Sequence, residues 1–558
     1  MRLLLPACAC ALTLVACRSK ETAGPTSDVG GTIVIATPGE PAAVLPPLVG
    51  ENAGRALSDL IFDRLAEISF DLGTVGDKTF APRLAKSWTW SPDSLSIAFS
   101  IDPRARWHDG KPVTAGDVRF TFLATIDPKV ASQNAPLLSN VDSVAVRDSL
   151  TAVVYYKRRR PEQFYDFVYQ LPIMPQHVYG NIPLADLKTA EAARRPIGSG
   201  QFRFVRWDAG SRYEIIADTA NYRGRPKLDR LIFTVVRDPA VAAAQVLSGQ
   251  ADFFEAFPVD QLLKLDSSSV ARGTPLPSNG YAYVAMNPWD RKVKTRPHPI
   301  FGDLAVRRAL SMAVDRSAML QNVFGKYGRI GYGPFPRTIA SADTTLRLPP
   351  YDVTQAAALL DSAGWRAASA GAVRTKNGVP LRFGLMVPTT SLFRMKFAVL
   401  LQEQFRKVGA QVDVENVDMG ATFLPRQTNG DFDAELALFG TDPAVSGAKQ
   451  SWSTEGIGPN GQNALRYSNR AVDALLDSAS GAFDEAKSKS YSSRAYQKII
   501  DDAPAIWLYD MVTFAGSHRR LKLTPMRADG WHNDVANWSI PHTERIERDR
   551  IGLNPATP

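Results

Sequence analysis

Cysteine is almost absent from this chain, and the few cysteines are confined to its first residues. Among the 558 residues there are three, Cys8, Cys10 and Cys17. No later position can contribute to a disulfide or to a cysteine-ligated metal site. A nucleophilic cysteine activated by histidine is excluded from the body of the chain for the same reason.

The sequence also lacks the short motifs of several enzyme classes. Its six histidines form no H-x-x-x-H pair and no H-E-x-x-H, the spacings of helical zinc sites. No G-x-x-x-x-G-K-[ST] loop is present to bind nucleotide phosphates. The nearest approach to a nucleophile elbow is residues 197–200 (I-G-S-G), where isoleucine takes the place of the first glycine. We expect a protein that is not an enzyme and needs no metal or organic cofactor.

A long apolar run is missing as well. No segment has the about 18 unbroken apolar residues that a membrane-spanning helix needs, and the N-terminal run from Leu3 to Val15 is too short. That run follows a single positive charge and ends in L-V-A-C, which is similar to a bacterial lipobox. In a lipobox, cleavage follows Ala16 and Cys17 receives the lipid. A plain secretory signal is the alternative.

The N-terminus therefore predicts a protein held outside the membrane by lipid. Residues 1–16 would be a lipoprotein signal peptide, and the polar residues 17–30 a flexible tether. The net charge of +9 suits a basic surface near an anionic membrane. The basic residues are scattered, and the one dense run, 157–160 (K-R-R-R), is typical of a solvated loop before Pro161. We expect no nucleic-acid partner.

Hydrophobic periodicity predicts mixed α/β structure. Residues 231–236 are typical of a strand, Asp238 then caps a helix, and residues 251–254 form the next strand. The second half has the same style, because a long amphipathic helix over 391–408 precedes an alternating strand over 411–417. We interpret the chain as two large α/β lobes.

Several short segments occur in the order found in one known family. The sharpest is residues 106–118 (R-W-H-D-G-K-P-V-T-A-G-D-V), preceded by residues 82–88 (P-R-L-A-K-S-W). Residues 196–202 (P-I-G-S-G-Q-F) follow, with Gln201 where the family has proline. Further matches are 221–229, 247–252, 303–316, 358–365 and 503–508. Together these segments resemble the peptide- and nickel-binding proteins of ABC importers, extracellular solute-binding protein family 5.

Most motif residues also have a local structural explanation. Thr114 and Asp117 predict a capping box at the start of a helix. Gly198 and Gly200 are expected to adopt backbone conformations that other residues resist. The motifs therefore identify a fold more than they mark residues that contact a ligand.

The resemblance implies a two-lobed clamp of the periplasmic-binding-protein-like type II class, with an extra subdomain in the first lobe. Its first lobe would comprise residues 31–280 and 507–558, with the inserted subdomain at 69–190. The second lobe would comprise residues 281–506. Hinge closure would bury a solute between the lobes.

In peptide-binding relatives the ligand lies extended and is held through its main chain, and an acidic residue after an aromatic one binds its amino group. The corresponding stretch here is residues 439–443 (F-G-T-D-P). If Phe439 takes the aromatic position, Asp442 binds the amine, with Gly440 and Thr441 between them. A register anchored on Pro443 leaves no acid, and Asp442 would then be a turn residue.

Two further ligand-binding candidates lie elsewhere in the chain. One is the loop after the first predicted strand, with Thr37, Gly39 and Glu40, because ligands of α/β proteins gather beyond the carboxyl ends of strands. The other is Trp452, which would either stack on the ligand or pack in the protein.

The resemblance implies the extracytoplasmic substrate-binding component of an ABC importer, which captures peptides and delivers them to permease subunits as a monomer. The alternatives are another solute, such as an oligosaccharide, a nickel complex or an opine-like compound, and a chaperone or receptor lipoprotein on the same fold. A sugar binder should present several aromatic rings to the cleft. A peptide binder needs an acid and the edge of a strand.

Overall fold

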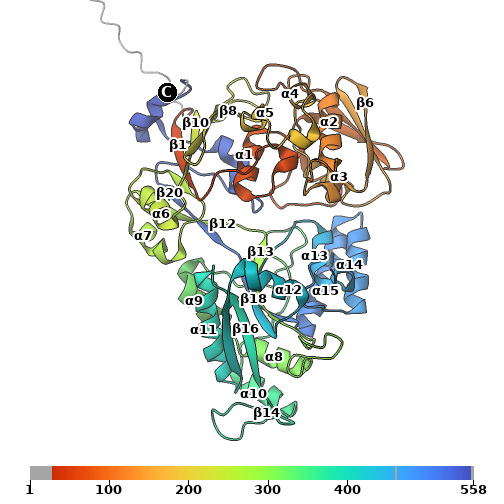
Figure 1. The fold of residues 1–558 in the computed structure, drawn as a ribbon, viewed down its shortest axis with the longest axis vertical. Helices are drawn as coiled ribbons and strands as arrows, with labels where there is room; N and C mark the ends of the chain where they lie inside the picture. The colour runs from red at the N-terminus through yellow and green to blue at the C-terminus, as the bar shows by residue number, and fades with distance from the viewer. Residues whose placement is uncertain (1–27, 459–460, 555–558) are drawn as a thin grey trace, which may run out of the picture.

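The computed structural model describes residues 28–458 and 461–554. The predicted signal peptide (1–16), Cys17 and most of the predicted tether (17–30) lie outside the described residues. The described chain forms two bodies, one above the other in Figure 1. The upper body contains the N-terminal half and the C-terminal end of the chain, and the lower body contains the part between them.

The upper body is built on a seven-stranded sheet with the order β12-β20-β11-β1-β10-β9-β8. The central strand β1 runs parallel to β10 and β11 and is buried, with Ile33 and Ile35 in the core. Asp238 caps α6 through the N–H of Ala240 at 2.7 Å, as the sequence predicts. The elements are β1 (Thr32–Thr37), α1 (Asn52–Ile61), β8 (Phe202–Asp208), β9 (Arg212–Ala217), β10 (Arg230–Val235), α6 (Pro239–Leu247), β11 (Phe253–Phe254), α7 (Leu262–Ser267), β12 (Ala271–Leu276) and β20 (Thr513–His518).

A subdomain with its own core extends this upper body. Its four-stranded antiparallel sheet has the order β4-β5-β7-β6, and its core is rich in aromatic residues such as Phe99, Phe164 and Phe167. The N–H of Thr114 donates to Asp117 at 2.8 Å at the start of α2, in agreement with the predicted capping. The elements are β2 (Ala66–Ile68), β3 (Phe80–Pro82), β4 (Ala85–Trp90), β5 (Ser96–Ile101), α2 (Ala115–Ile126), β6 (Val141–Asp148), β7 (Thr151–Tyr156), α3 (Gln163–Val168), α4 (Gln176–Tyr179) and α5 (Glu191–Arg194).

The lower body is built on a five-stranded sheet with the order β17-β16-β18-β13-β19. Because side chains alternate along a strand, β13 sends Ala282 and Val284 into one core and Tyr281 and Tyr283 into another. The elements are β13 (Gly280–Met286), α8 (Leu304–Met312), α9 (Arg316–Phe324), α10 (Val353–Ser362), β14 (Thr375–Lys376), β15 (Val379–Pro380), β16 (Arg382–Pro388), α11 (Leu392–Arg406), β17 (Gln411–Val417), α12 (Leu424–Asn429), β18 (Ala434–Gly440), α13 (Val445–Trp452), α14 (Arg470–Gly481), α15 (Glu485–Asp502) and β19 (Ala505–Asp510).

The chain crosses between the two sheets twice, at neighbouring positions. β12 leads into β13 through residues 277–279, and β19 leads into β20 through residues 511–512. The two crossings are joined by the N–H of Met511, which donates to the Gly280 carbonyl at 2.8 Å. The lobe boundary expected at residue 507 therefore falls inside β19, which pairs with β13 as far as Asp510. The switch to the upper sheet comes only after that strand ends.

The glycines of the 196–202 motif are required for a different reason from the one expected. Neither Gly198 nor Gly200 has a positive φ among the described residues. Instead the Gly200 N–H donates to the Ile61 carbonyl at 2.8 Å, and a Cβ on Gly198 would lie 1.9 Å from that same oxygen. Close approach of two backbones, and not an unusual φ, excludes a side chain here.

The Gly198→Ala variant should therefore lose about 2–4 kcal/mol of stability, since the new methyl group overlaps a backbone oxygen that cannot move alone. The matched control is Gly481→Ala, because a Cβ there meets no atom within 4 Å. Urea unfolding midpoints of both variants and the parent measure the difference. Equal midpoints for Gly198→Ala and the parent would contradict this explanation.

Candidate functional site

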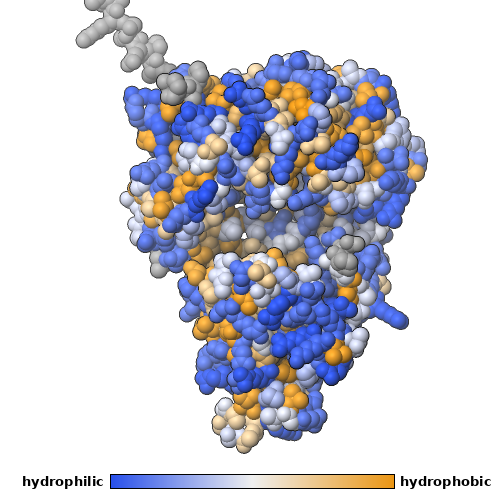
Figure 2. Space-filling view, in the orientation of Figure 1, coloured by the Kyte–Doolittle hydropathy of each residue, from blue (hydrophilic) through white to orange (hydrophobic). Residues whose placement is uncertain are grey.

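The candidate site lies where the two lobes face each other. Figure 2 shows the molecule hollowed between them. One cavity between the lobes has a volume of about 700 Å³ and is lined by residues of both, among them Phe70, Asp71, Met526 and Ala528 of the first lobe and Thr338, Ile339 and Lys489 of the second. A solute held in this gap would contact both lobes at once.

The end of β18 presents an unpaired backbone edge beside Asp442. The Thr441 N–H donates to the Asn279 carbonyl at 2.7 Å, so by antiparallel alternation the N–H and C=O of Gly440 point away from β13. On that other side β16 pairs with β18 only at Ala434 and Glu435. No strand of the described residues covers the edge at Gly440, and the space beside its Cα is open.

Asp442 links this edge to the first lobe. Its Oδ1 accepts the hydroxyl of Tyr165 from α3 at 2.9 Å and the N–H of Ala444 at 2.8 Å. The residue is exposed, although protein from both lobes surrounds the carboxylate. Burial raises the pKa of Asp442, while those two hydrogen bonds and the charge of Arg55 act in the opposite direction.

Two more carboxylates of the first lobe lie close to Asp442. Glu162 is buried and accepts the Thr74 hydroxyl at 2.8 Å and the N–H of Val445 at 2.7 Å. Burial is the main cause that raises the pKa of Glu162. Burial, reinforced by the charge of Glu162, raises the pKa of Asp166 to about 7. Three carboxylates therefore lie close together where the two lobes meet, and this junction is acidic.

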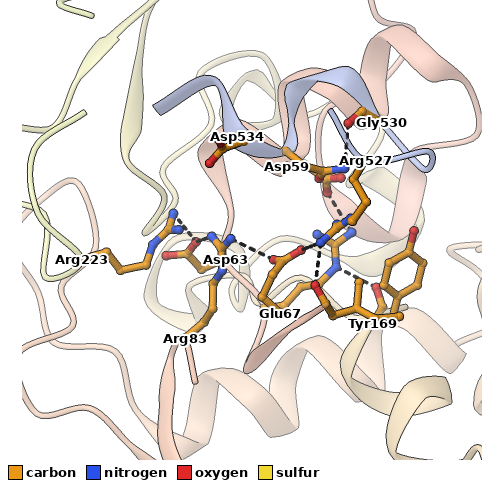
Figure 3. A network of polar contacts seen from close by, with 12 residues as sticks. Asp59, Asp63, Glu67, Arg83, Tyr169, Arg223, Arg527, Gly530 and Asp534 are labelled. Carbon is orange, nitrogen blue, oxygen red and sulfur yellow. Dashed lines mark hydrogen bonds and ion pairs between the residues drawn. The ribbon is translucent and has the colours of Figure 1, made fainter. Parts of the chain in front are cut away.

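A buried ion network includes Tyr169, the ring neighbour of Tyr165 (Figure 3). Tyr165 stacks on Tyr169 with ring centroids 4.9 Å apart, and the Tyr169 hydroxyl donates to Asp529 at 2.7 Å. Arg527 in turn bonds Asp529 and Glu67, each at 2.6 Å. These contacts join the C-terminal segment to the segment that enters the subdomain, and so fix the wall that carries Tyr165.

The network includes further pairs of opposite charge, among them Arg223 with Asp63 at 2.8 Å (Figure 3). Arg64 bonds Asp59 at 2.9 Å and the Tyr169 carbonyl at 2.7 Å. The nearby positive charge of Arg64 and the hydrogen bond from His532 outweigh burial and hold the pKa of Asp59 well below its usual range. The wall is thus held by charges that stay ionised at neutral pH.

The loop after the first strand is positioned by first-lobe contacts. The Thr37 hydroxyl donates to the Gly39 carbonyl at 3.0 Å. Glu40 accepts Trp207 Nε1 at 3.0 Å and the Gly210 N–H at 2.9 Å, and this second bond is the largest cause that lowers the pKa of Glu40. No contact found among the described residues brings this loop together with Asp442.

Of the candidates in the second lobe, Phe439 and Trp452 take different positions. Phe439 is half-buried at the end of β18, with its ring 5.8 Å from that of Tyr281. Trp452 is 2% exposed and donates from Nε1 to the Tyr281 hydroxyl at 3.1 Å. Its ring lies 5.2 Å from that of Trp507 and 5.9 Å from that of Tyr283, so Trp452 occupies the core, as the packing alternative expects.

Comparison with known proteins assigns the chain to a family. A sequence model described as bacterial extracellular solute-binding proteins, family 5 (middle) matches residues 79–457, more than half of the chain. The chain belongs to this family. It is a family of solute-binding proteins and not of catalysts. The resemblance inferred from the short motifs is confirmed.

Individual relatives agree with this assignment. The oligopeptide-binding protein AppA of Bacillus subtilis is 26% identical over 500 residues, which cover 88% of each chain. Its solved structure, in complex with a nonapeptide, has a TM-score of 0.68 at 24% identity and covers 92% of this chain and 99% of that one.

Two further solved structures support the fold. The ABC transporter substrate-binding protein CtaP of Listeria monocytogenes has a TM-score of 0.78 at 20% identity, with coverage of 92% and 100%. NikZ of Campylobacter jejuni, in complex with Ni(L-His), has a TM-score of 0.70 at 23% identity, with coverage of 91% and 99%. The expected two-lobed periplasmic-binding fold is confirmed.

Two features are absent from the described residues of this family 5 protein. Within residues 28–458 and 461–554, no helix has the length and apolar character needed to cross a bilayer. Over the same described residues, no group of three or more His, Cys, Asp or Glu side chains is placed to hold a metal ion.

Sequence reasoning missed the first-lobe partners of the site. Glu162 and Tyr165 directly follow the basic run 157–160, which we expected to be a solvated loop. Part of that run makes specific contacts, because Arg159 lies over the ring of Phe483 in the second lobe at 4.1 Å. No short motif marks these residues, since their partners are more than 270 positions away.

The Arg527→Met variant should be destabilised by about 3–5 kcal/mol, since it removes the buried guanidinium that pairs with both Glu67 and Asp529. The matched control is Arg104→Met. Arg104 also pairs with an aspartate, but its side chain is 73% exposed, so its loss should cost less than about 1 kcal/mol. Thermal unfolding of both variants tests this difference, and similar losses would contradict it.

A second prediction concerns the pH dependence of stability. The pKa of Asp166 is raised to about 7 in the folded protein. The stability that comes from keeping Asp166 protonated is therefore fully present below the unfolded pKa and is lost as pH rises through about 7. The unfolding free energy of Asp166→Asn should equal that of the parent near pH 4 and should be higher than that of the parent by about 1–3 kcal/mol at pH 8. Urea titrations at the two pH values measure this. A difference that does not grow with pH would contradict it.

Proposed function

We propose that this protein is the substrate-binding component of an ABC importer, which captures peptides between its lobes and delivers them to permease subunits. Membership of family 5 supports the solute-binding role. The 26% identity to an oligopeptide-binding protein over 88% of both chains supports a peptide as the solute. The L-V-A-C sequence ending at Cys17 supports an extracytoplasmic protein anchored by lipid.

The observation that carries the peptide assignment is the juxtaposition of an acid with a free strand edge. Gly440 directs its N–H and C=O away from β13, to a side where no strand of the described residues pairs with them, so an extended main chain can add there as another strand. Asp442 lies two residues further on, where the ammonium group at the start of such a chain can meet a carboxylate. Main-chain hydrogen bonds do not depend on side-chain identity, so this arrangement suits peptides of varied sequence.

Both lobes contribute to the same ligand position, which couples binding to closure. The strand edge and Asp442 belong to the second lobe, while Tyr165, Glu162 and Asp166 belong to the first. A ligand favours the closed form only through contacts that the open form lacks. An ammonium group between the carboxylates of the two lobes provides such a contact.

The acidity of the gap also favours a second candidate, a cationic solute other than a peptide, such as a nickel complex. NikZ, a solved relative in fold, binds Ni(L-His). Such a solute would use the carboxylates of Asp442, Glu162 and Asp166 but would have no use for the free edge at Gly440. Identification of the co-purifying solute by mass spectrometry separates the two candidates.

Replacement of Asp442 tests the amine position. Asp442→Asn should weaken binding of a peptide with a free amino terminus about 10–100-fold, since the ammonium loses its counter-charge in a partly solvated site. The same change should leave binding of the N-acetylated peptide within about threefold. Calorimetry with a peptide identified in the purified protein, in both forms, measures these affinities.

The matched control is Asp413→Asn, which removes an exposed aspartate on the edge strand β17 of the same lobe. Its affinities for both peptide forms should equal those of the parent. Equal losses for the free and acetylated peptides in Asp442→Asn would defeat the proposed role of Asp442. Absence of any bound peptide would defeat the proposed function itself.

A further inference from the structure

The N-terminus of α13 has no cap from its own sequence. Its N-cap position is Ala444, whose side chain has no acceptor. The first N–H groups of a helix have no partner within the helix and need acceptors from elsewhere. Here Val445 and Ser446 donate to the carboxylate of Glu162, at 2.7 and 3.4 Å. The cap of a second-lobe helix is therefore supplied by the first lobe.

Glu162 is held in place for this contact by its own lobe. It is 2% exposed and comes directly before α3, and the Thr74 hydroxyl donates to its Oε1 at 2.8 Å. A carboxylate at a helix N-terminus also interacts favourably with the helix dipole, beyond the two hydrogen bonds. When the lobes separate, water replaces these contacts, so the interaction stabilises only the closed arrangement.

Neighbouring contacts extend the same junction. Ala444 is 7% exposed and packs into the core of the subdomain, although it belongs to the second lobe. Asp442 accepts the Tyr165 hydroxyl two residues earlier in the chain. The subdomain thus contacts residues 442–446 of the second lobe through a hydrogen bond, an apolar contact and a helix cap. Each of these contacts joins two groups of the protein itself.

We propose that Glu162 is a latch between the lobes: it caps α13 in the ligand-free protein and so contributes to closure before any solute is bound. The ligand then adds its own contacts to a closed form that is already populated. The latch also sets the position of Asp442, because the segment it grips begins there.

Hydrogen–deuterium exchange of the Val445 and Ser446 amides in the ligand-free protein tests this proposal. These amides have no acceptor within the helix, so their protection reports the latch directly. The experiment uses the full chain, dialysed until native mass spectrometry detects no bound solute. The parent should protect both amides, and Glu162→Gln, which keeps the side-chain shape but loses the charge, should exchange them at least about tenfold faster.

The matched control is Glu191→Gln, since Glu191 is an exposed first-lobe glutamate whose side chain is 86% accessible. In this variant the Val445 and Ser446 amides should exchange at the same rate as in the parent. In every variant the amides of β13 should stay protected, which separates loss of the latch from loss of the fold. Rapid exchange of both amides in the parent, or equal rates in the parent and Glu162→Gln, would overturn the proposal.

A second variant approaches the contact from the other lobe. Val445→Pro removes the stronger donor, and proline is tolerated at the first position of a helix, after an Ala444 that is already extended at ψ 142°. It should speed exchange of Ser446, and adding Glu162→Gln should cause a smaller further change than Glu162→Gln causes in the parent, since both changes weaken one contact. Additive effects would overturn the proposal. No ligand is used, so this failure would leave the peptide assignment standing.

Discussion

The fold depends on one topological constraint, the paired crossing of the chain between two sheets. β12 and β20 lie side by side in the upper sheet, while β13 and β19 lie side by side in the lower one. Only residues 277–279 and 511–512 connect them. Two short adjacent connections permit rotation about one axis and little else. The gap between the lobes and the placement of residues from both on its walls follow from this arrangement.

Electrostatics explains how such a gap can hold a charged solute. The wall behind Tyr165 is built from ion pairs that satisfy one another, such as Arg527 with Asp529 and Glu67. The carboxylates of Asp166 and Asp442 at the lobe junction are less fully compensated, because burial by the surrounding protein raises the pKa of both. A cation that enters the gap lowers the cost of ionising them. The balanced network holds the wall in place, and in the proposed binding mode the uncompensated acids attract the positive charge of the solute.

Much of the fold could be predicted from the sequence, because its signals are local. Asp238 before Pro239 predicted the start of α6, and the alternation over 411–417 predicted β17 as observed. The order of the short motifs along the chain indicated the family. The crossing at 511–512 was predicted a few residues too early. All residues of β19 are buried, so the sequence around residue 507 has no feature that marks where the chain leaves the lower sheet.

The candidate site could be predicted only in part. Asp442 was found through its likeness to a family position, and its placement at the lobe junction agrees with that likeness without testing it. Glu162 and Tyr165 could not be found, because a helix cap supplied by a residue 283 positions away leaves no pattern in either segment. The reason for Gly198 was also missed, since close approach to Ile61 is a property of the folded chain alone.

The most direct test of the account is a crystal structure of the protein with the solute that co-purifies with it. The account predicts an extended peptide between the lobes, with its amino group within hydrogen-bonding distance of Asp442 and its main chain paired with Gly440. A solute bound elsewhere, or one without a main chain at Gly440, would contradict it.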